Sequence, residues 1–426
     1  MDRAKSLLIP TRDIITLFLL IELTIVPLVP FFIKILLIGF ILLFLLVLSP
    51  KVSLFFLQSI RPLIYILIVA ILMGFQSFLS EPYNYIRDGY YFFQPILLIF
   101  LGYSALSRGI SFNFLLRLMV FSSIFLTFYF YIDFILSLFL GQGLSFESRY
   151  IFGLNSDFAI IGFLITYASY QANFKLFQPL SMTLILTTLF FLIMISFSRT
   201  NILITLVIII YPYISKLINF KTQLFLVSFL IIIPVFFGSF LNVAIPEEGA
   251  SNFLSKVLNS YSEIIVRDYR DSDAVAPDAN LINLYWRSQE AFLGLAKYTE
   301  GSSYELIFGQ GLGSYASAAG IFENKFQQIP FFHNGFITIL LKSGPLGVLL
   351  FFQFLYLFVR NTLSNELNNK SEEDFIRIIA PSIVFITILK TFFIMGFYTP
   401  ESPVLLLTLI GIVLKKCSDI SNQNII

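Results

Sequence analysis

Long apolar segments recur from one end of this 426-residue chain to the other, and they limit its possible folds more than any other feature. Segments of about eighteen residues or more can cross a hydrocarbon layer that is about 30 Å thick. Hydrophobic residues make up 58% of the chain and charged residues 12%, whereas soluble domains have roughly 45–50% and about 25%. A soluble core could not bury this much apolar surface. The sequence therefore predicts a protein whose solvent is largely lipid.

The apolar segments predict helices. Backbone groups have no water to bond to inside a bilayer, so spanning segments form helices or closed barrels, and runs without strict alternation favour helices. About twelve spans fit the chain when each takes about twenty residues. They lie near residues 13–30, 31–49, 62–80, 90–106, 114–140, 153–171, 179–197, 200–215, 222–245, 331–359, 375–396 and 399–415. The predicted fold class is an all-α polytopic membrane protein.

Lys and Arg gather in alternate connections, as the positive-inside rule requires. The predicted cytoplasmic segments hold Arg3, Lys5, Arg12, Lys51, Arg61, Arg108, Arg117, Lys175, Lys216, Lys221, Arg360, Lys370, Arg377, Lys415 and Lys416. Both termini are then cytoplasmic. The first apolar run lacks a small-residue cleavage site, so we interpret it as a retained helix and not a signal peptide.

One long loop divides the predicted spans. Residues 1–245 hold the first nine, residues 246–330 form a large extracytoplasmic loop, and residues 331–426 hold the last three and a cytoplasmic tail. Within the loop, apolar residues at helical spacing predict amphipathic helices at 252–269 and 280–298. We therefore expect a small extramembrane domain there.

Composition excludes several kinds of function. The net charge is +2 with scattered basic residues, which argues against a nucleic-acid partner. The single cysteine, Cys417, excludes an intramolecular disulfide and a cysteine-based metal site. The carboxylates show no metal-ligand spacing, so no metal and no cofactor are predicted.

Three arginines occupy short outside connections where the positive-inside rule disfavours them: Arg87, Arg149 and Arg199. Guanidinium groups are always charged and present forked donors that suit phosphate oxygens. All three are predicted on the same side of the membrane, which favours a site for an anionic ligand. A structural pairing or a lipid headgroup contact is the alternative for each of them.

His333, the only histidine, lies where the long loop re-enters the membrane, and Asn334 follows it. A histidine exchanges protons near neutral pH, so it suits acid–base catalysis, and Asn334 is able to orient a polar ligand. A satisfied structural histidine is the alternative. The stretch 308–315 is rich in glycine, and its amides either approach an anion or form a tight turn.

Other charges have two interpretations as well. Arg267, Arg270 and Arg287 add positive charge to the long loop, but Arg287 and Glu290 have the spacing of a helical salt bridge. Asp133 and Lys390 fall inside predicted spans. They form either a proton or ion pathway or a structural contact.

Several motifs together resemble the bacterial O-antigen polymerase and O-antigen ligase superfamily, the Wzy and WaaL type. The motifs are Arg149-Tyr-Ile-Phe-Gly153-Leu-Asn155, Ser196-Phe-Ser198-Arg199-Thr200, Gly309-Gln-Gly311-Leu-Gly313-Ser-Tyr315, His333-Asn334 and Lys342-Ser-Gly344-Pro-Leu-Gly347. Their order around one large outside loop, from about residue 145 to 350, carries the resemblance together with the twelve-span plan.

The resemblance implies a GT-C-like, membrane-embedded glycosyltransferase of polysaccharide and lipopolysaccharide biosynthesis in the bacterial inner membrane, with its active site facing the periplasm. Its substrates would be glycans on undecaprenyl pyrophosphate. A polymerase passes the growing glycan to the non-reducing end of a lipid-linked repeat unit, and a ligase passes it to lipid A core. A chain-length regulator and a flippase are the implied protein partners.

The resemblance also assigns roles to residues. Arg149, Arg199 and Arg287 would bind the pyrophosphate, with Arg199 also catalytic and Arg87 a secondary contact. His333 would be the general base. Asn334, Gly311, Gly313 and Tyr315 would position the substrate.

Two further classes compete with this interpretation. A flippase or transporter for the same lipid-linked sugars would distribute cations through a central cavity on many spans, whereas here they gather on one face. A structural membrane protein leaves the sidedness of the arginines and His333 unexplained. The leading prediction is the polymerase, and the ligase is the nearest alternative.

Overall fold

The structure, a computed structural model, describes residues 21–25, 28, 33, 36–37, 39–40, 52–139, 157–196, 198–214, 222, 279–317, 328–363, 369–393, 396–398 and 403–423. Its longer helices are α3 (Leu54–Met73), α5 (Pro82–Ser107), α6 (Phe112–Phe139), α8 (Asp157–Gln171), α9 (Pro179–Ile195), α10 (Arg199–Ile214), α14 (Ala279–Thr299), α16 (Gly335–Leu363), α17 (Lys370–Phe393) and α18 (Val404–Gln423). The shorter elements are the π-helical turn η2 (Ile21–Ile25), α4 (Phe75–Ser80), α15 (Glu305–Phe308) and the strands β1 (Ala316–Ser317) and β2 (Gln328–Ile329). The two strands are antiparallel, with Ala316 opposite Ile329.

Within these residues, five helices are long and apolar enough to cross a membrane: α3, α5, α6, α16 and α17. This agrees with the predicted all-α membrane protein. The predicted number of about twelve spans is not confirmed. The spans predicted at 13–30, 31–49 and 222–245 fall largely outside the described residues, and every other predicted span overlaps a helix of the structure.

Helix α3 differs from its predicted bounds. It begins at Leu54, before the predicted residue 62, because the Ser53 hydroxyl accepts a hydrogen bond from the amide of Phe56 (3.2 Å) and caps the helix. Arg61, predicted in a cytoplasmic connection, therefore lies inside α3, with its guanidinium 5.9 Å from the ring centre of Tyr65. The helix ends at Met73, and the chain turns at Gly74 into α4.

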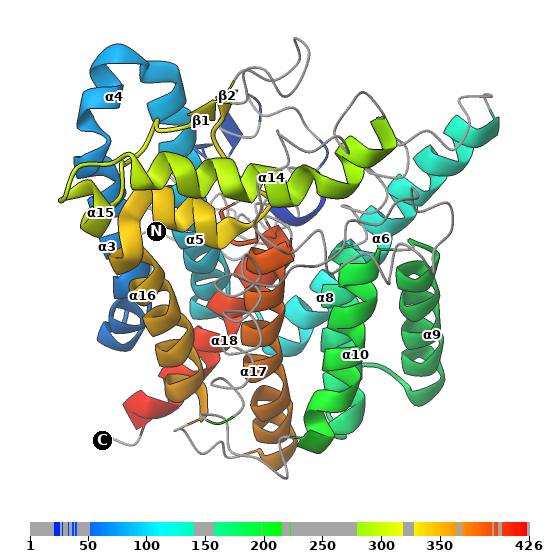
Figure 1. Cartoon of the computed structure of the whole chain (residues 1–426). Helices are drawn as coiled ribbons and strands as arrows, with labels where there is room; N and C mark the ends of the chain where they lie inside the picture. Colours follow the sequence, from blue (N-terminus) through cyan, green and yellow to red (C-terminus); the bar gives the residue numbers. More distant parts are fainter. Residues whose placement is uncertain are drawn as a thin grey trace, which may run out of the picture.

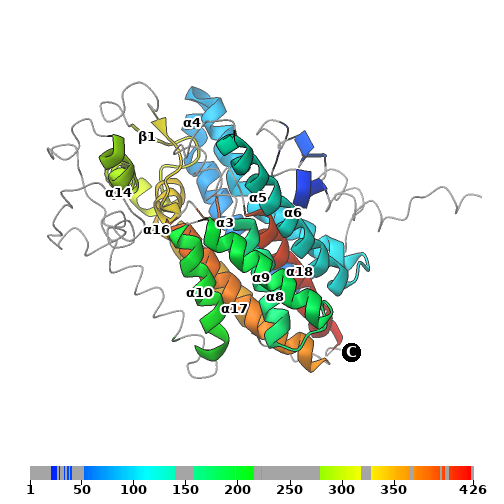
Figure 2. The same cartoon turned by 90° about the vertical axis from the view of Figure 1, so that its right-hand side faces the viewer.

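Helix α14 lies across one end of the helix bundle, as Figure 1 shows. Helix α16 is kinked at Gly344, and its part after the kink and α17 run lengthwise beneath α14, while α4 and the two strands lie at this same end. The last turns of α18 lie at the opposite end, and Figure 2 agrees in a view turned by 90°. We call the first of these the α14 end.

Helices α5 and α18 pack with very little space between their backbones. A Cβ atom on Gly102 of α5 would lie 2.1 Å from the carbonyl oxygen of Thr408, and one on Gly411 of α18 would lie 1.9 Å from that of Ile99. Small residues allow this approach, which gains packing contacts inside a membrane, where the hydrophobic effect does not drive helices together. This packing fixes the position of α5 against α18, and the first turns of α5 are fixed with it.

Candidate functional site

His333 forms a short contact with a buried carboxylate. Its ring atom Nδ1 lies 2.5 Å from Oε2 of Glu290 on α14, and its backbone N–H donates to the same oxygen (3.1 Å). The Glu290 side chain is only 3% exposed and that of His333 is 15% exposed. A carboxylate on Nδ1 selects the tautomer that carries its proton there. Within the described residues Nε2 has no hydrogen-bond partner, so it is the nitrogen able to take a proton.

Packing between α14 and the start of α16 brings the pair together. Phe332 is fully buried, and its amide donates to the hydroxyl of Thr338 (3.0 Å). A Cβ atom on Gly294 would lie 2.5 Å from Ile337 and 2.9 Å from the Phe332 ring. Because Glu290 precedes Gly294 by four residues, this close approach sets Glu290 beside His333.

Asn334 begins α16. Its side-chain oxygen accepts a hydrogen bond from the amide of Phe336 (3.1 Å), and its carbonyl accepts from the amides of Ile337 and Thr338. These are the bonds of a helix N-cap, a position that asparagine favours. The role of Asn334 in positioning a substrate stays a prediction.

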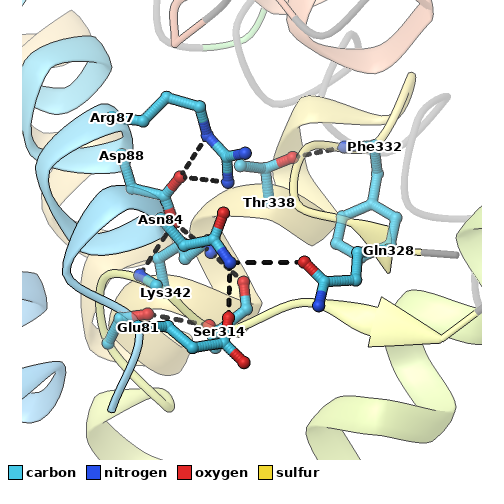
Figure 3. Close-up of polar contacts among 11 residues, drawn as sticks. Glu81, Asn84, Arg87, Asp88, Ser314, Gln328, Phe332, Thr338 and Lys342 are labelled. Carbon is cyan, nitrogen blue, oxygen red and sulfur yellow. Dashed lines mark hydrogen bonds and ion pairs between the residues drawn. The ribbon is translucent and has the colours of Figure 1, made fainter. Parts of the chain in front are cut away.

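A second group of charges, Arg87, Asp88 and Lys342, lies at the α14 end (Figure 3). Together with the backbone amide of Gly313 we call it the Asp88 cluster. Oδ1 of Asp88 accepts hydrogen bonds from Nη2 (2.9 Å) and Nε (3.2 Å) of Arg87. Oδ2 accepts from Nζ of Lys342 (2.6 Å) and from the amide of Gly313 (2.8 Å). Both Asp88 and Lys342 are 0% exposed, so the carboxylate that the two cations share is out of contact with water.

Phe331 connects the Asp88 cluster with His333. The guanidinium of Arg87 and the ammonium of Lys342 each lie 5.7 Å from the centre of the Phe331 ring, which is within cation–π range. His333 follows two residues later in the chain. The Arg87 side chain is 18% exposed, so it is the member of the cluster that meets solvent or a ligand.

The glycine-rich turn from 309 to 313 uses its amides within the protein. Gln310, Gly311 and Leu312 donate to the carbonyl oxygens of Leu341 (2.7 Å), Lys342 (3.1 Å) and Ala70 (2.9 Å), and Gly313 donates to Asp88. Gly309, Gly311 and Gly313 all have positive φ, a conformation that glycine adopts without strain. Of the two interpretations of this stretch, an anion-binding loop and a tight turn, these bonds support the tight turn. The role of Gly311 and Gly313 in positioning a substrate stays a prediction.

Tyr315 follows this turn and contacts the first turns of α5. Its hydroxyl donates to Oε1 of Glu81 (3.1 Å), and that hydrogen bond, together with burial, raises the pKa of Tyr315. Nδ2 of Asn84 donates to the other Glu81 oxygen (2.5 Å) and to Gln328 of β2 (3.3 Å; Figure 3). Tyr315 is thus a neutral donor in this network, and its contact with a substrate stays a prediction.

Arg199 begins α10. The Tyr167 hydroxyl of α8 donates to the carbonyl of Ile209 in α10 (3.1 Å), and each residue lies ten positions after the first residue of its helix. The first residues of the two helices, Asp157 and Arg199, are therefore level. Asp157 pairs with Lys390 (2.8 Å) near the end of α17 that reaches α14 (Figure 1). The backbone of Arg199 thus lies at the α14 end, and its side chain lies outside the described residues.

The remaining predicted residues have different outcomes. Arg149, Arg267 and Arg270 and the side chain of Asp133 lie outside the described residues. Lys390 makes an ion pair with Asp157, and its two interpretations stay open. Arg287 lies on α14, three residues before Glu290, whose Oε2 atom bonds His333. The salt bridge with Glu290 and the pyrophosphate-binding site, the two interpretations of Arg287, both stay predictions.

Three residues of the site were missed from the sequence: Asp88, Lys342, and Glu290 as the partner of His333. The available signal was their charge, since Asp88 and Lys342 lie in or beside apolar segments where an ionisable residue is costly and usually paired. Only the fold identifies which charges meet. Among the described residues, no three His, Cys, Asp or Glu side chains lie close enough together to hold a metal ion.

The fold and the site define an all-α membrane protein with a carboxylate-bound histidine and a buried ionic cluster at one end of its helices. Comparison with models of known protein families and with curated protein sequences gives no match.

Proposed function

We propose that this protein is a membrane-embedded glycosyltransferase of the O-antigen polymerase type, which moves a growing glycan from undecaprenyl pyrophosphate to the non-reducing end of a lipid-linked repeat unit. The observation that supports it best is the Glu290–His333 pair, joined through Phe331 to a cluster with more cations than anions. A base beside positive charge is what transfer from a pyrophosphate carrier needs. The order of the sequence motifs supports the same class.

In the proposed reaction, an acceptor hydroxyl oxygen attacks the anomeric carbon that joins the donor glycan to the carrier. The bond from this carbon to the pyrophosphate oxygen breaks, and its electron pair leaves with undecaprenyl pyrophosphate. The hydroxyl proton moves to Nε2 of His333. Glu290 stabilises the resulting imidazolium, because its carboxylate lies 2.5 Å from Nδ1.

The leaving pyrophosphate gains negative charge as this bond breaks, and cations held in place stabilise it. Arg87 is suited to this because its guanidinium is partly exposed and held over the Phe331 ring. Arg149, Arg199 and Arg287 are the proposed further contacts. The proposal places the α14 end on the periplasmic side of the inner membrane, with both termini in the cytoplasm and a flippase and chain-length regulator as partners.

Loss of an arginine that stabilises the leaving group should slow transfer. Replacing Arg87 or Arg199 with alanine should lower the rate by about 100-fold, because a missing donor to a developing anion commonly has this effect. The measurement is glycan chain length over time, with purified protein in nanodiscs and a lipid-linked repeat unit. Arg377→Ala is the control, since Arg377 lies near the start of α17 and pairs there with Glu373. Normal chain growth in either variant would remove that arginine from the mechanism.

Glycans from a strain that lacks the gene distinguish the polymerase from the other classes. Loss of a polymerase leaves single repeat units attached to their final acceptor. Loss of a ligase leaves long chains on the lipid carrier, and loss of a flippase leaves lipid-linked units inside the cell. Either of the last two patterns would contradict the proposed function.

A further inference from the structure

The Asp88 cluster has an unequal charge balance. Arg87 and Lys342 contribute two positive charges and Asp88 one negative charge. Asp88 and Lys342 are completely buried, so water does not screen the interaction between them as it does between surface charges. The cluster therefore carries one net positive charge, and its only partly exposed charged group is the Arg87 guanidinium.

The two oxygens of Asp88 are divided between the cations. Oδ1 bonds Arg87 only, while Oδ2 bonds Lys342 and the amide of Gly313. Lys342 also donates to the carbonyl oxygen of Ser314, so its side chain bonds two oxygen acceptors. The positive charge of Lys342 thus lies beside the Asp88 carboxylate, which would otherwise pair with Arg87 alone.

Arg87 keeps donors for a ligand. Its Nε and Nη2 atoms bond Asp88, and Nη1 makes no hydrogen bond with any residue that the structure describes. The rings of Phe331 and Tyr83 lie 5.7 and 5.8 Å from the guanidinium carbon and hold the group in place. The free edge of the guanidinium is therefore fixed, charged and partly exposed.

We propose that Lys342 is a positioning residue for anion binding: its buried charge offsets Asp88, so that Arg87 presents an uncompensated positive charge to the pyrophosphate of the lipid carrier. This inference rests on the proposed function. Without Lys342, Asp88 and Arg87 would form a neutral pair, and the attraction for an anion would fall. If the role of Lys342 were purely structural, it would hold α16 against α5 and the glycine-rich turn, and its charge would have no effect on anion binding.

Charge restoration separates these two roles. In Lys342→Gln the amide is still able to donate to Asp88, but the net charge of the cluster falls from +1 to zero. In the double variant Lys342→Gln/Asp88→Asn one positive and one negative charge are removed together, so the net charge returns to +1. Replacing a buried ion pair by neutral groups of similar shape is often tolerated, whereas removing one partner is costly. The double variant is therefore expected to fold at least as well as the single one.

The experiment measures the dissociation constant of farnesyl pyrophosphate for the full chain in nanodiscs. Lys342→Gln should weaken binding by about tenfold or more, and the double variant should restore it to about the wild-type value. Lys415→Gln is the control, because Lys415 pairs with Asp419 in the last turns of α18, at the opposite end of the bundle. Folding is checked by size exclusion before each titration.

The outcomes are distinct. Unchanged binding in Lys342→Gln, or a folded double variant that binds as weakly as the single one, would overturn the inference and leave the proposed function standing. If Lys342→Gln does not fold, comparison of the double variant with the wild type decides: equal affinity supports the inference and tenfold weaker binding overturns it. A wild-type protein that does not bind farnesyl pyrophosphate would overturn the proposed function and the inference together.

Discussion

Replacement of His333 by alanine is expected to lower the rate of glycan transfer by about 10²–10⁴-fold, the usual contribution of general acid–base catalysis. The variant loses the atom that accepts the proton from the acceptor hydroxyl. The rate is measured with purified protein in nanodiscs and a lipid-linked repeat unit, and the amount of protein in the membrane is measured alongside. Normal chain length with a normal amount of His333→Ala protein would remove His333 from the mechanism.

Glu290→Gln tests the same assignment from the other side of the contact. The neutral amide keeps the shape of the side chain but stabilises the imidazolium less, so the rate should fall by roughly 10-fold or more, and less than in His333→Ala. Glu300→Gln is the matched control, because Glu300 follows the same helix, is exposed, and pairs with Lys297. Equal rates in both glutamine variants would show that Glu290 does not assist the base.

Substitution of Gly311 by alanine is expected to lower the free energy of unfolding by roughly 2–5 kcal/mol, from backbone strain and overpacking together. Gly311 has a φ of +82°, and a Cβ atom there would lie 1.9 Å from the backbone nitrogen of Gly74. Backbone atoms cannot rotate away as a side chain does, so α3 and the turn would have to separate. The measurement is thermal unfolding of the detergent-solubilised protein.

Gly109→Ala is a matched control for this prediction. Gly109 has a similar φ of +79°, but a Cβ atom there would meet nothing within 4 Å. The Gly109→Ala variant should therefore lose only about 1–2 kcal/mol of its free energy of unfolding, from the strain of the left-handed conformation. An equal loss of stability in both variants would mean that the contact between the turn and Gly74 contributes nothing. That contact matters to the site because the same turn carries the Gly313 amide to Asp88.

Much of the helical structure could be predicted from composition along the chain. The run near 375–396 became α17 (Lys370–Phe393), and the amphipathic pattern at 280–298 became α14 (Ala279–Thr299). Both follow from local hydropathy and its period. The break between α3 and α4 could not be predicted in this way, because Gly74 ends the helix against Leu312, a residue far away in the sequence.

The site was predictable only in part. The residue types of His333 and Arg87, together with their predicted sidedness, were enough to mark both as candidates. Their partners were hidden because Glu290 lies 43 positions from His333, and Lys342 lies 254 positions from Asp88. The spacing of Arg287 and Glu290 suggested a local salt bridge as one alternative and gave no sign of the contact between Glu290 and His333.

Local sequence was sufficient to establish that this chain forms helices suited to lipid, and it marked a few cationic side chains and one histidine as candidates. The cost of exposing apolar groups to water, or backbone groups to lipid, acts along each segment separately, so it can be evaluated one segment at a time. Which charges meet was settled only by the tertiary structure. A buried ion pair depends on distances of a few ångströms between helices, and those distances are set by packing, as by Gly294 against Phe332 and by the glycine-rich turn against α3.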